Sequence, residues 1–243
     1  MEHTTTDNRR TDAETKPPDG SVARVRADVY GLLAAVFDGN VETLQTALDD
    51  GTFATLGAEL PGDTALDVLD RPGFTAEKLR IGYDNLFVVP GQHYVPPFAS
   101  AYVDEPSESF ESDSPYHDAG QAGELFGDPA AAAAHSYATV GFEPDCGDDV
   151  PDHIAASFEF MQALSEREAV LLSQNPDSET AETVATLRDR QRETVDRLGW
   201  LDQFHEAVAA EDTVEGVFAG LARFARTFVA WDAMEGIPDV RSR

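Results

Sequence analysis

The sequence is poor in cysteine and has no long apolar run. Cys146 is the only cysteine among the 243 residues, so an internal disulfide and a cysteine-rich zinc or iron-sulfur site are excluded. Cys146 itself fits a small, partly buried residue. Because no apolar stretch approaches the ~18 residues that a membrane helix needs, we predict no membrane span.

Basic residues are also scarce. The chain has 17 lysines and arginines against 46 acidic residues, a formal net charge of -29. Nucleic acid is a disfavoured partner, because phosphate binding needs a basic stripe. The acids are spread along the chain, which favours a surface that stays hydrated in concentrated salt, as in a halophile's cytoplasm. The alternative is that the acidic residues form a groove for a basic ligand. Such a groove can exist at one place on the surface even if the overall charge serves hydration.

The N-terminal residues 1–20 lack a hydrophobic period and are predicted to be a disordered tail. This tail contains an arginine pair, Arg9 and Arg10. A twin-arginine export signal needs an apolar segment directly behind the pair, and residues 11–20 are polar. We therefore expect a cytoplasmic protein.

Most of the remaining chain shows helical periodicity, with apolar residues recurring at three- and four-residue steps. Asp149 is a good N-cap for one of these helices, with Pro151 in its first turn. No stretch alternates apolar and polar residues long enough to predict a sheet. The predicted helices cover residues 21–37, 41–48, 53–60, 64–69, 75–86, 128–139, 151–174 and 178–198, a continuation after Gly199, and residues 213–231.

These patterns predict an all-α fold, a single globular domain of about ten helices over residues 21–235. A tail of residues 236–243 follows it, and an acidic loop, residues 106–123, interrupts it. Residues 83–105 form a crossover with three prolines and with tyrosine and histidine rings. Prolines fix φ and lower the cost of ordering a loop, so the crossover is either a rigid connection or the lining of a groove.

Three short segments carry a family resemblance: "YDNLFVVPG", "PPFASAY" and "VPDHIAASFEFMQAL". They resemble the signatures of the TorD/DmsD/NarJ family of cytoplasmic redox-enzyme maturation chaperones, and the excess of acid points to a haloarchaeal member. The later "GWLDQF" is similar to the family's tryptophan helix through Trp200 and Phe204, with Asp196 where a histidine is usual. The residues that match the three signatures are Tyr83, Leu86, Phe87, Pro90 and Gly91; Pro97, Ser100 and Tyr102; and Pro151, Asp152, His153, Glu159, Phe160 and Met161.

The resemblance implies a chaperone that binds the twin-arginine signal peptide, or a related N-terminal segment, of a molybdenum-cofactor oxidoreductase of the dimethyl sulfoxide, trimethylamine oxide or nitrate reductase type. It would hold that precursor until the cofactor is inserted. The alternative is a chaperone for the body of a non-exported or nitrate-reductase-like catalytic subunit, without signal-peptide reading. We expect no enzymatic activity, because the sequence has no metalloprotease, phosphate-loop or nucleophile-elbow motif. We also expect no cofactor and no metal site. The sequence leaves open whether the protein forms a dimer.

The resemblance also implies a peptide-binding set. Asp152 is the carboxylate expected to take an arginine bidentately, with His153 as its hydrogen-bonding partner. Tyr83, Leu86, Phe87 and Tyr102 are the groove candidates, and Pro90, Gly91, Pro97, Ser100 and Pro151 complete the set. The alternatives are that Asp152 serves the helix dipole, that His153 bonds a loop carbonyl, and that Leu86 and Phe87 belong to the core.

Overall fold

The computed structural model describes residues 20–59, 67–103, 127–174 and 177–238. Over these ranges the regular structure is helical and there is no β-strand, so the predicted all-α fold is confirmed. The α-helices are α1 (Ser21–Phe37), α2 (Val41–Asp49), α3 (Thr52–Glu59), α4 (Ala76–Tyr83), α5 (Asp128–Ala138), α6 (Ile154–Ser173), α7 (Ser178–Arg197), α8 (Leu201–Glu211) and α9 (Val217–Trp231). Four short helical turns, η1 (Asp84–Val88), η2 (Ala99–Tyr102), η3 (Leu198–Trp200) and η4 (Asp232–Gly236), lie between or after them.

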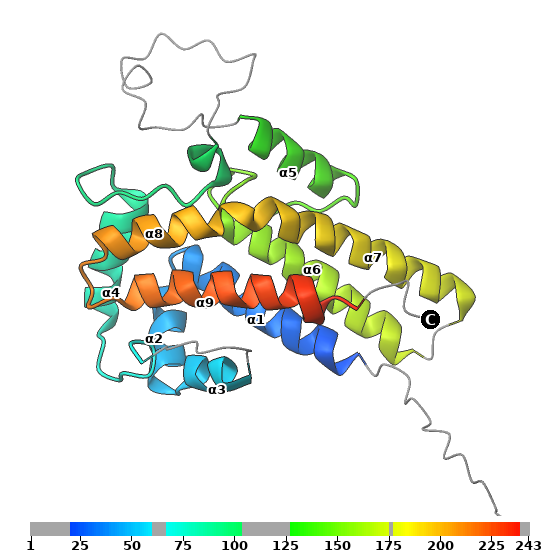
Figure 1. The fold of residues 1–243 in the computed structure, drawn as a ribbon, viewed down its shortest axis with the longest axis horizontal. Helices are drawn as coiled ribbons and strands as arrows, with labels where there is room; N and C mark the ends of the chain where they lie inside the picture. Colours follow the sequence, from blue (N-terminus) through cyan, green and yellow to red (C-terminus); the bar gives the residue numbers. More distant parts are fainter. Residues whose placement is uncertain (1–19, 60–66, 104–126, 175–176, 239–243) are drawn as a thin grey trace, which may run out of the picture.

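The long helices form an elongated bundle (Figure 1). Helix α1 packs along α6, α7 lies against α6, and α8 lies against α9. Helices α2, α3 and α4 gather at one end of the bundle, and α5 lies outside it, next to η2. None of the described helices is long and apolar enough to cross a bilayer.

Aromatic side chains from four helices meet in the middle of the core. Phe37 of α1 lies with its ring centroid 6.0 Å from that of Phe158 on α6 and 5.9 Å from that of Phe204 on α8. Phe218 of α9 is fully buried in the same cluster. Burying each such side chain contributes about 1.5–3 kcal/mol, so these rings fix how the helices pack.

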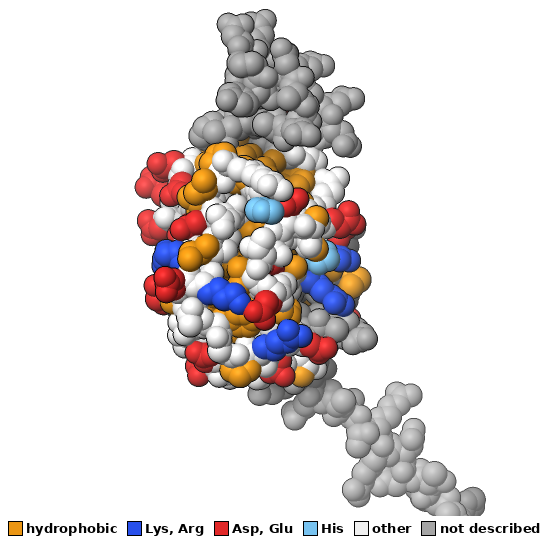
Figure 2. Space-filling view, turned by 90° about the vertical axis from the view of Figure 1, so that its left-hand side faces the viewer, with side chains coloured by type: hydrophobic (Ala, Val, Ile, Leu, Met, Phe, Trp, Pro, Cys, Tyr) orange, Lys and Arg blue, Asp and Glu red, His pale blue; other side chains and the backbone are white. Residues whose placement is uncertain are grey.

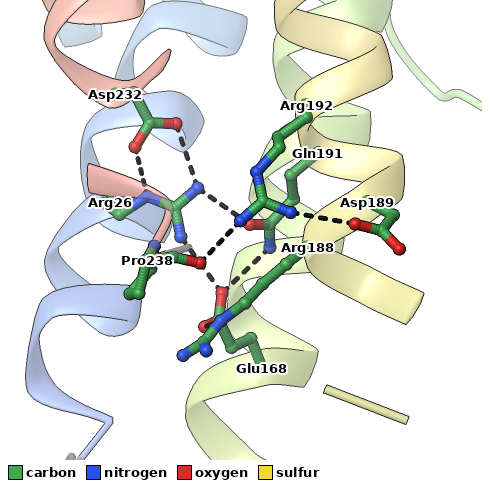
Figure 3. A network of polar contacts seen from close by, with 8 residues as sticks. All are labelled: Arg26, Glu168, Arg188, Asp189, Gln191, Arg192, Asp232 and Pro238. Atoms are coloured by element: carbon green, nitrogen blue, oxygen red, sulfur yellow. Dashed lines mark hydrogen bonds and ion pairs between the residues drawn. The ribbon is translucent and has the colours of Figure 1, made fainter. Parts of the chain in front are cut away.

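A buried polar network fastens the C-terminal turn η4 to the bundle (Figure 3). Arg26 of α1 donates from Nε and Nη2 to the two oxygens of Asp232, and from Nη1 to Glu168 Oε2 at 3.1 Å. Tyr30 Oη donates to Asp232 Oδ2 at 2.7 Å, and Gln191 bridges Arg26 and Glu168. Each of these buried charged groups is therefore hydrogen-bonded within the fold.

Figure 2 shows the face at the end of the bundle where α4 lies. Acidic, basic and apolar side chains are interspersed there. Lys78 pairs with Glu215 at 2.5 Å and Arg80 with Glu42 at 3.1 Å. The described part of this face therefore presents no continuous basic stripe of the kind that phosphate groups bind.

Two predicted helices differ from the structure. Residues 67–70 form turns, so the helix predicted over residues 64–69 is wrong in its described part, while residues 60–66 lie outside the described ranges. The helix predicted over residues 75–86 ends as α4 at Tyr83 and continues as the π-turn η1. The Leu86 carbonyl accepts from Val95 N at 2.7 Å, which ties the crossover back onto this turn.

The predicted start of α6 is also wrong. Asp148 and Asp149 have φ angles of 49° and 63°, which no residue of a right-handed helix adopts. The helix begins at Ile154, and His153 is its N-cap, with Nδ1 accepting from Ala155 N at 3.1 Å. Asp152 therefore precedes the N-cap and does not lie in the first turn of the helix.

Some predictions lie outside the described residues. The N-terminal tail falls in residues 1–19, the acidic loop 106–123 falls in residues 104–126, and most of the C-terminal tail falls in residues 239–243. Ile237, which precedes the last of these ranges, is buried in the core. The boundaries of the domain at residues 21 and 235 stay a prediction.

Candidate functional site

The site forms where the second and third signature segments meet. The Ile154 amide donates to the Pro97 carbonyl at 2.8 Å, and the Ala99 amide donates to the Asp152 carbonyl at 3.1 Å. These bonds form an isolated antiparallel bridge between Phe98 and His153. Segments 55 residues apart in the chain, counted from Phe98 to His153, are thereby joined backbone to backbone directly before α6.

Asp152 has one occupied and one open carboxylate oxygen. Its Oδ2 accepts from the Ser100 amide at 2.7 Å and from the Ser100 hydroxyl at 2.5 Å. Its Oδ1 is buried and has no hydrogen-bond partner among the residues that the structure describes. Asp152 is only 3% exposed, and an unpaired buried carboxylate oxygen is costly. A donor that reaches Oδ1 would gain the bond that the fold leaves unmade.

Asp152 lines a cavity of about 440 Å³. The cavity lies between η2, the start of α5 and the junction of α7 with η3, and its volume falls within the range of about 300–1,000 Å³ that is usual for ligand pockets. Its walls are mostly small or apolar. The residues that line it are Ala99, Tyr102, Val103, Gly127, Asp128, Pro129, Ala132, Ala133, Asp152, Ser157, Asp196, Arg197, Gly199 and Trp200.

One wall of the cavity is a stacked pair of rings. Tyr102 and Trp200 lie with their ring centroids 5.1 Å apart and their planes 18° apart. The Tyr102 hydroxyl donates to the Pro96 carbonyl at 2.9 Å, and Phe204 packs edge-on behind both rings. A planar cation such as a guanidinium can stack on such a surface.

The lining of the cavity carries a net negative charge. Asp128, Asp152 and Asp196 oppose Arg197, which gives a formal charge of -2. Asp128 and Asp196 are exposed, whereas Asp152 is buried. Two monovalent cations would therefore neutralise the lining, one reaching the buried carboxylate and one staying near the exposed ones.

Tyr102, Ser100 and Asp152 are the predicted site residues that meet at this cavity. The Pro97 carbonyl accepts from the Ile154 amide at the start of α6, and the Pro151 carbonyl accepts from the Tyr137 hydroxyl at 2.8 Å. These two prolines support the site without lining it.

His153 caps α6 and does not bond Asp152. Burial lowers its pKa to about 4, so at neutral pH the ring is uncharged and can accept from the Ala155 amide. The partner predicted for Asp152 is therefore replaced by Ser100. The bidentate capture predicted for Asp152 is also unavailable, because Ser100 already occupies Oδ2 with two hydrogen bonds.

The residues of the first signature lie away from the cavity. Leu86 and Phe87 are buried in the core, and Tyr83 donates from its hydroxyl to the Phe37 carbonyl at 2.8 Å. Pro90 and Gly91 are exposed in the crossover. A role of these five residues in peptide binding stays a prediction.

Twelve of the fourteen lining residues were not among the predicted site residues, and four of these twelve carry a charge or an aromatic ring. In the sequence, Asp128 looks like any acidic residue at the start of a helix. Asp196 and Arg197 look like ordinary charged residues on the polar face of α7. Trp200 lies in η3, next to this end of α7. The signal that could have found the last three is the run "DRLGW", in which the two charges that end α7 are followed by the leucine, glycine and tryptophan of η3. Among the described residues, no group of three or more histidine, cysteine or acidic side chains could hold a metal.

Comparison with known proteins supports the same region. The model of the protein family described as "Nitrate reductase delta subunit" matches residues 53–206, which is more than half of the chain. The match runs from α3 to α8 and includes the Pro97–Asp152 junction, Arg197 and Trp200. No curated protein and no solved structure matches the chain.

Proposed function

Since the chain belongs to the nitrate reductase delta subunit family, whose members are chaperones for molybdoenzyme maturation, we propose that it binds the twin-arginine signal peptide of a molybdoenzyme precursor. It holds the precursor, the catalytic subunit, in the cytoplasm until the molybdenum cofactor is inserted and the protein is exported. The family resemblance seen in the sequence is confirmed by this match, and the family implies a molybdoenzyme subunit as the partner.

The observation that carries this proposal is the unpaired Oδ1 of Asp152, a residue that lines a cavity with a formal charge of -2. One arginine of the peptide donates to Asp152 Oδ1 and stacks on Trp200 of the ring pair. The second arginine stays near the exposed Asp128 and Asp196. The pair of arginines thereby supplies both the missing donor and the charge that neutralises the lining.

Titration calorimetry with a synthetic peptide tests this proposal. The peptide carries the arginine pair and the following apolar segment of a molybdoenzyme signal from the same cell. A control peptide has glutamine at both arginine positions. Micromolar or tighter binding is expected for the arginine peptide only, and Asp152→Asn should weaken it by about 10- to 100-fold, the size of a hydrogen bond to a charged group.

The matched control is Glu166→Gln, an exposed carboxylate on α6 that bonds Gln162. It changes the net charge by the same amount, so its affinity for the peptide should equal that of the wild type. Equal weakening by both variants would mean that the overall charge of the chain, rather than the cavity, attracts the peptide.

A second candidate function is favoured by the description of the family. The description of the family names a subunit of nitrate reductase. This agrees with a chaperone that binds the body of a catalytic subunit and does not bind a signal peptide. Pull-down of the full precursor and of a precursor lacking its N-terminal segment separates the two. Equal capture of both would favour this second function, and loss of the shortened precursor would favour signal reading.

A further inference from the structure

Arg197, the last residue of α7, brings a positive charge into the cavity. Its side chain is half-buried, and its Nη2 donates to the Thr194 hydroxyl at 3.0 Å. Burial lowers the pKa of the guanidinium from its usual value, so part of its hydration has been lost. A desolvated cation is an unexpected component of a cavity that receives arginines.

Arg197 has no contacting carboxylate among the described residues, although the charge of Glu193, four residues earlier on α7, acts on it from a distance and raises its pKa. No carboxylate of the described residues forms an ion pair with it, whereas the fully buried Arg26 pairs with both Glu168 and Asp232. Asp152 lines the same cavity, and its buried Oδ1 has no hydrogen-bond partner among the described residues. The fold therefore keeps one positive and one negative group in a single cavity without pairing them.

We propose that Arg197 is a specificity-determining residue that limits the positive charge of the peptide that the cavity accepts. This inference depends on the proposed function. Without Arg197 the three aspartates of the lining would give a charge of -3, and a third basic side chain would be drawn in. With Arg197 present the arginine pair completes the neutralisation, and a third cation meets repulsion at close range.

Such a repulsive element suits this chain. A net charge of -29 attracts any basic segment, so attraction alone distinguishes poorly between a signal peptide and other basic peptides. Specificity then needs a feature that disfavours the wrong ligand. Because Arg197 is half-buried, dissolved salt screens its charge less than it screens the charges of the exposed surface.

The test compares two peptides that differ by one charge. One carries the arginine pair, and the other carries a third arginine directly next to the pair. For the wild type, the third arginine should leave the affinity unchanged or lower it. For Arg197→Gln, the third arginine should raise the affinity on the order of tenfold. This is the effect expected when the repulsion between the third arginine and Arg197 is removed, for unit charges about 10 Å apart at an effective dielectric constant of about 20.

Three further variants make the result specific. Arg197→Lys keeps the charge and should discriminate like the wild type. Arg197→Met is a second neutral replacement and should behave like Arg197→Gln, which keeps the test valid if one neutral variant folds poorly. Arg190→Gln removes a half-buried arginine of the same helix that bonds Thr139 outside the cavity lining, and it should leave discrimination unchanged.

The outcomes separate this inference from the proposed function. If the wild type binds the arginine pair but both neutral variants discriminate like the wild type, only the role of Arg197 is wrong. If the neutral variants lose affinity for the arginine pair, Arg197 is an attractive contact and the inference is overturned. If the wild type binds neither peptide, signal-peptide binding fails, and the inference fails with it.

Discussion

The two ends of α6 use buried carboxylates in opposite ways. Near its C-terminal end, Glu168 accepts from Arg26, Arg188 and Gln191, and Asp232 accepts from Arg26, which joins η4 to the bundle (Figure 3). The Tyr30 hydroxyl also donates to Asp232. Directly before its first turn, Asp152 is equally buried but keeps one oxygen unpaired beside a cavity. The two carboxylate sites lie roughly 24 Å apart along the helix, at about 1.5 Å per residue.

The difference shows how the same chemistry serves stability or recognition. A complete network has no remaining capacity for a ligand, so the Arg26 end contributes to folding alone. An incomplete network leaves a buried polar atom without a hydrogen bond, which destabilises the free protein, and a ligand that supplies the missing donor removes this destabilisation. Stability and peptide binding should therefore respond to different substitutions.

The largest expected effect on stability is at the completed end. Asp232→Ala leaves Arg26 buried without its main partner, and we expect the free energy of unfolding to fall by about 3–5 kcal/mol. Urea denaturation followed by circular dichroism measures this. Glu235→Ala, an exposed acid in the same turn, is the control and should change stability little.

Peptide affinity sharpens this first prediction. Under conditions where it is folded, Asp232→Ala should bind the arginine peptide as tightly as the wild type does. A loss of affinity in that variant would show that the two ends are coupled, and the contrast between them would then fail.

An effect of about 3 kcal/mol on stability is expected from pH through His153. Its folded pKa, about 4, lies below the unfolded value of about 6.5, so the unfolded chain binds more protons between these values. The stability that the neutral ring contributes is therefore present above pH 6.5 and is lost as the pH falls towards 4.

The neutral variant His153→Asn keeps an N-cap acceptor and serves as the reference for this measurement. Denaturation curves of both proteins across the window should show a steeper decline for the wild type. Parallel declines would mean that other groups, such as the many carboxylates, account for the whole pH dependence.

The smallest of these effects is expected at Ser100. Ser100→Ala removes the hydroxyl bond to Asp152 Oδ2 but leaves the amide bond, so stability should fall by about 1–2 kcal/mol. Affinity for the peptide should fall only slightly, because Oδ1 is unchanged. Ser173→Ala is the control, since that exposed hydroxyl bonds only the Val170 carbonyl of its own helix. A change in Ser100→Ala no larger than in the control would contradict the role of the serine.

Much of the fold was predictable because helices leave a periodic signal. The period of apolar residues gave α1, α5 and α7 nearly to the residue. The start of α6 could not be predicted in this way. The N-cap preference of aspartate, which pointed to Asp149, depends only on neighbouring residues in the chain. The contacts that fix this start are distant in the chain, since Asp38 binds the Gly147 amide and Pro97 binds the Ile154 amide.

The site was predictable as residue types but not as a geometry. The motif pointed to Asp152, yet only the fold shows that Ser100 occupies one of its oxygens and that the other is open. Arg197 was missed because an arginine near the end of a polar helix has no special signal in a sequence. Its position in the cavity depends on the turn η3, which ends α7 beside Trp200.

The most direct test of the central claim, that a guanidinium of the client peptide reaches Asp152, is a double-mutant cycle by calorimetry. Wild type and Asp152→Asn are titrated with the arginine-pair peptide and with two peptides in which one arginine is replaced by neutral citrulline. We predict a coupling energy of at least about 1 kcal/mol between Asp152 and one of the two arginines, and none with Glu166→Gln. Binding of the arginine pair with coupling below about 0.3 kcal/mol at both positions would contradict the account.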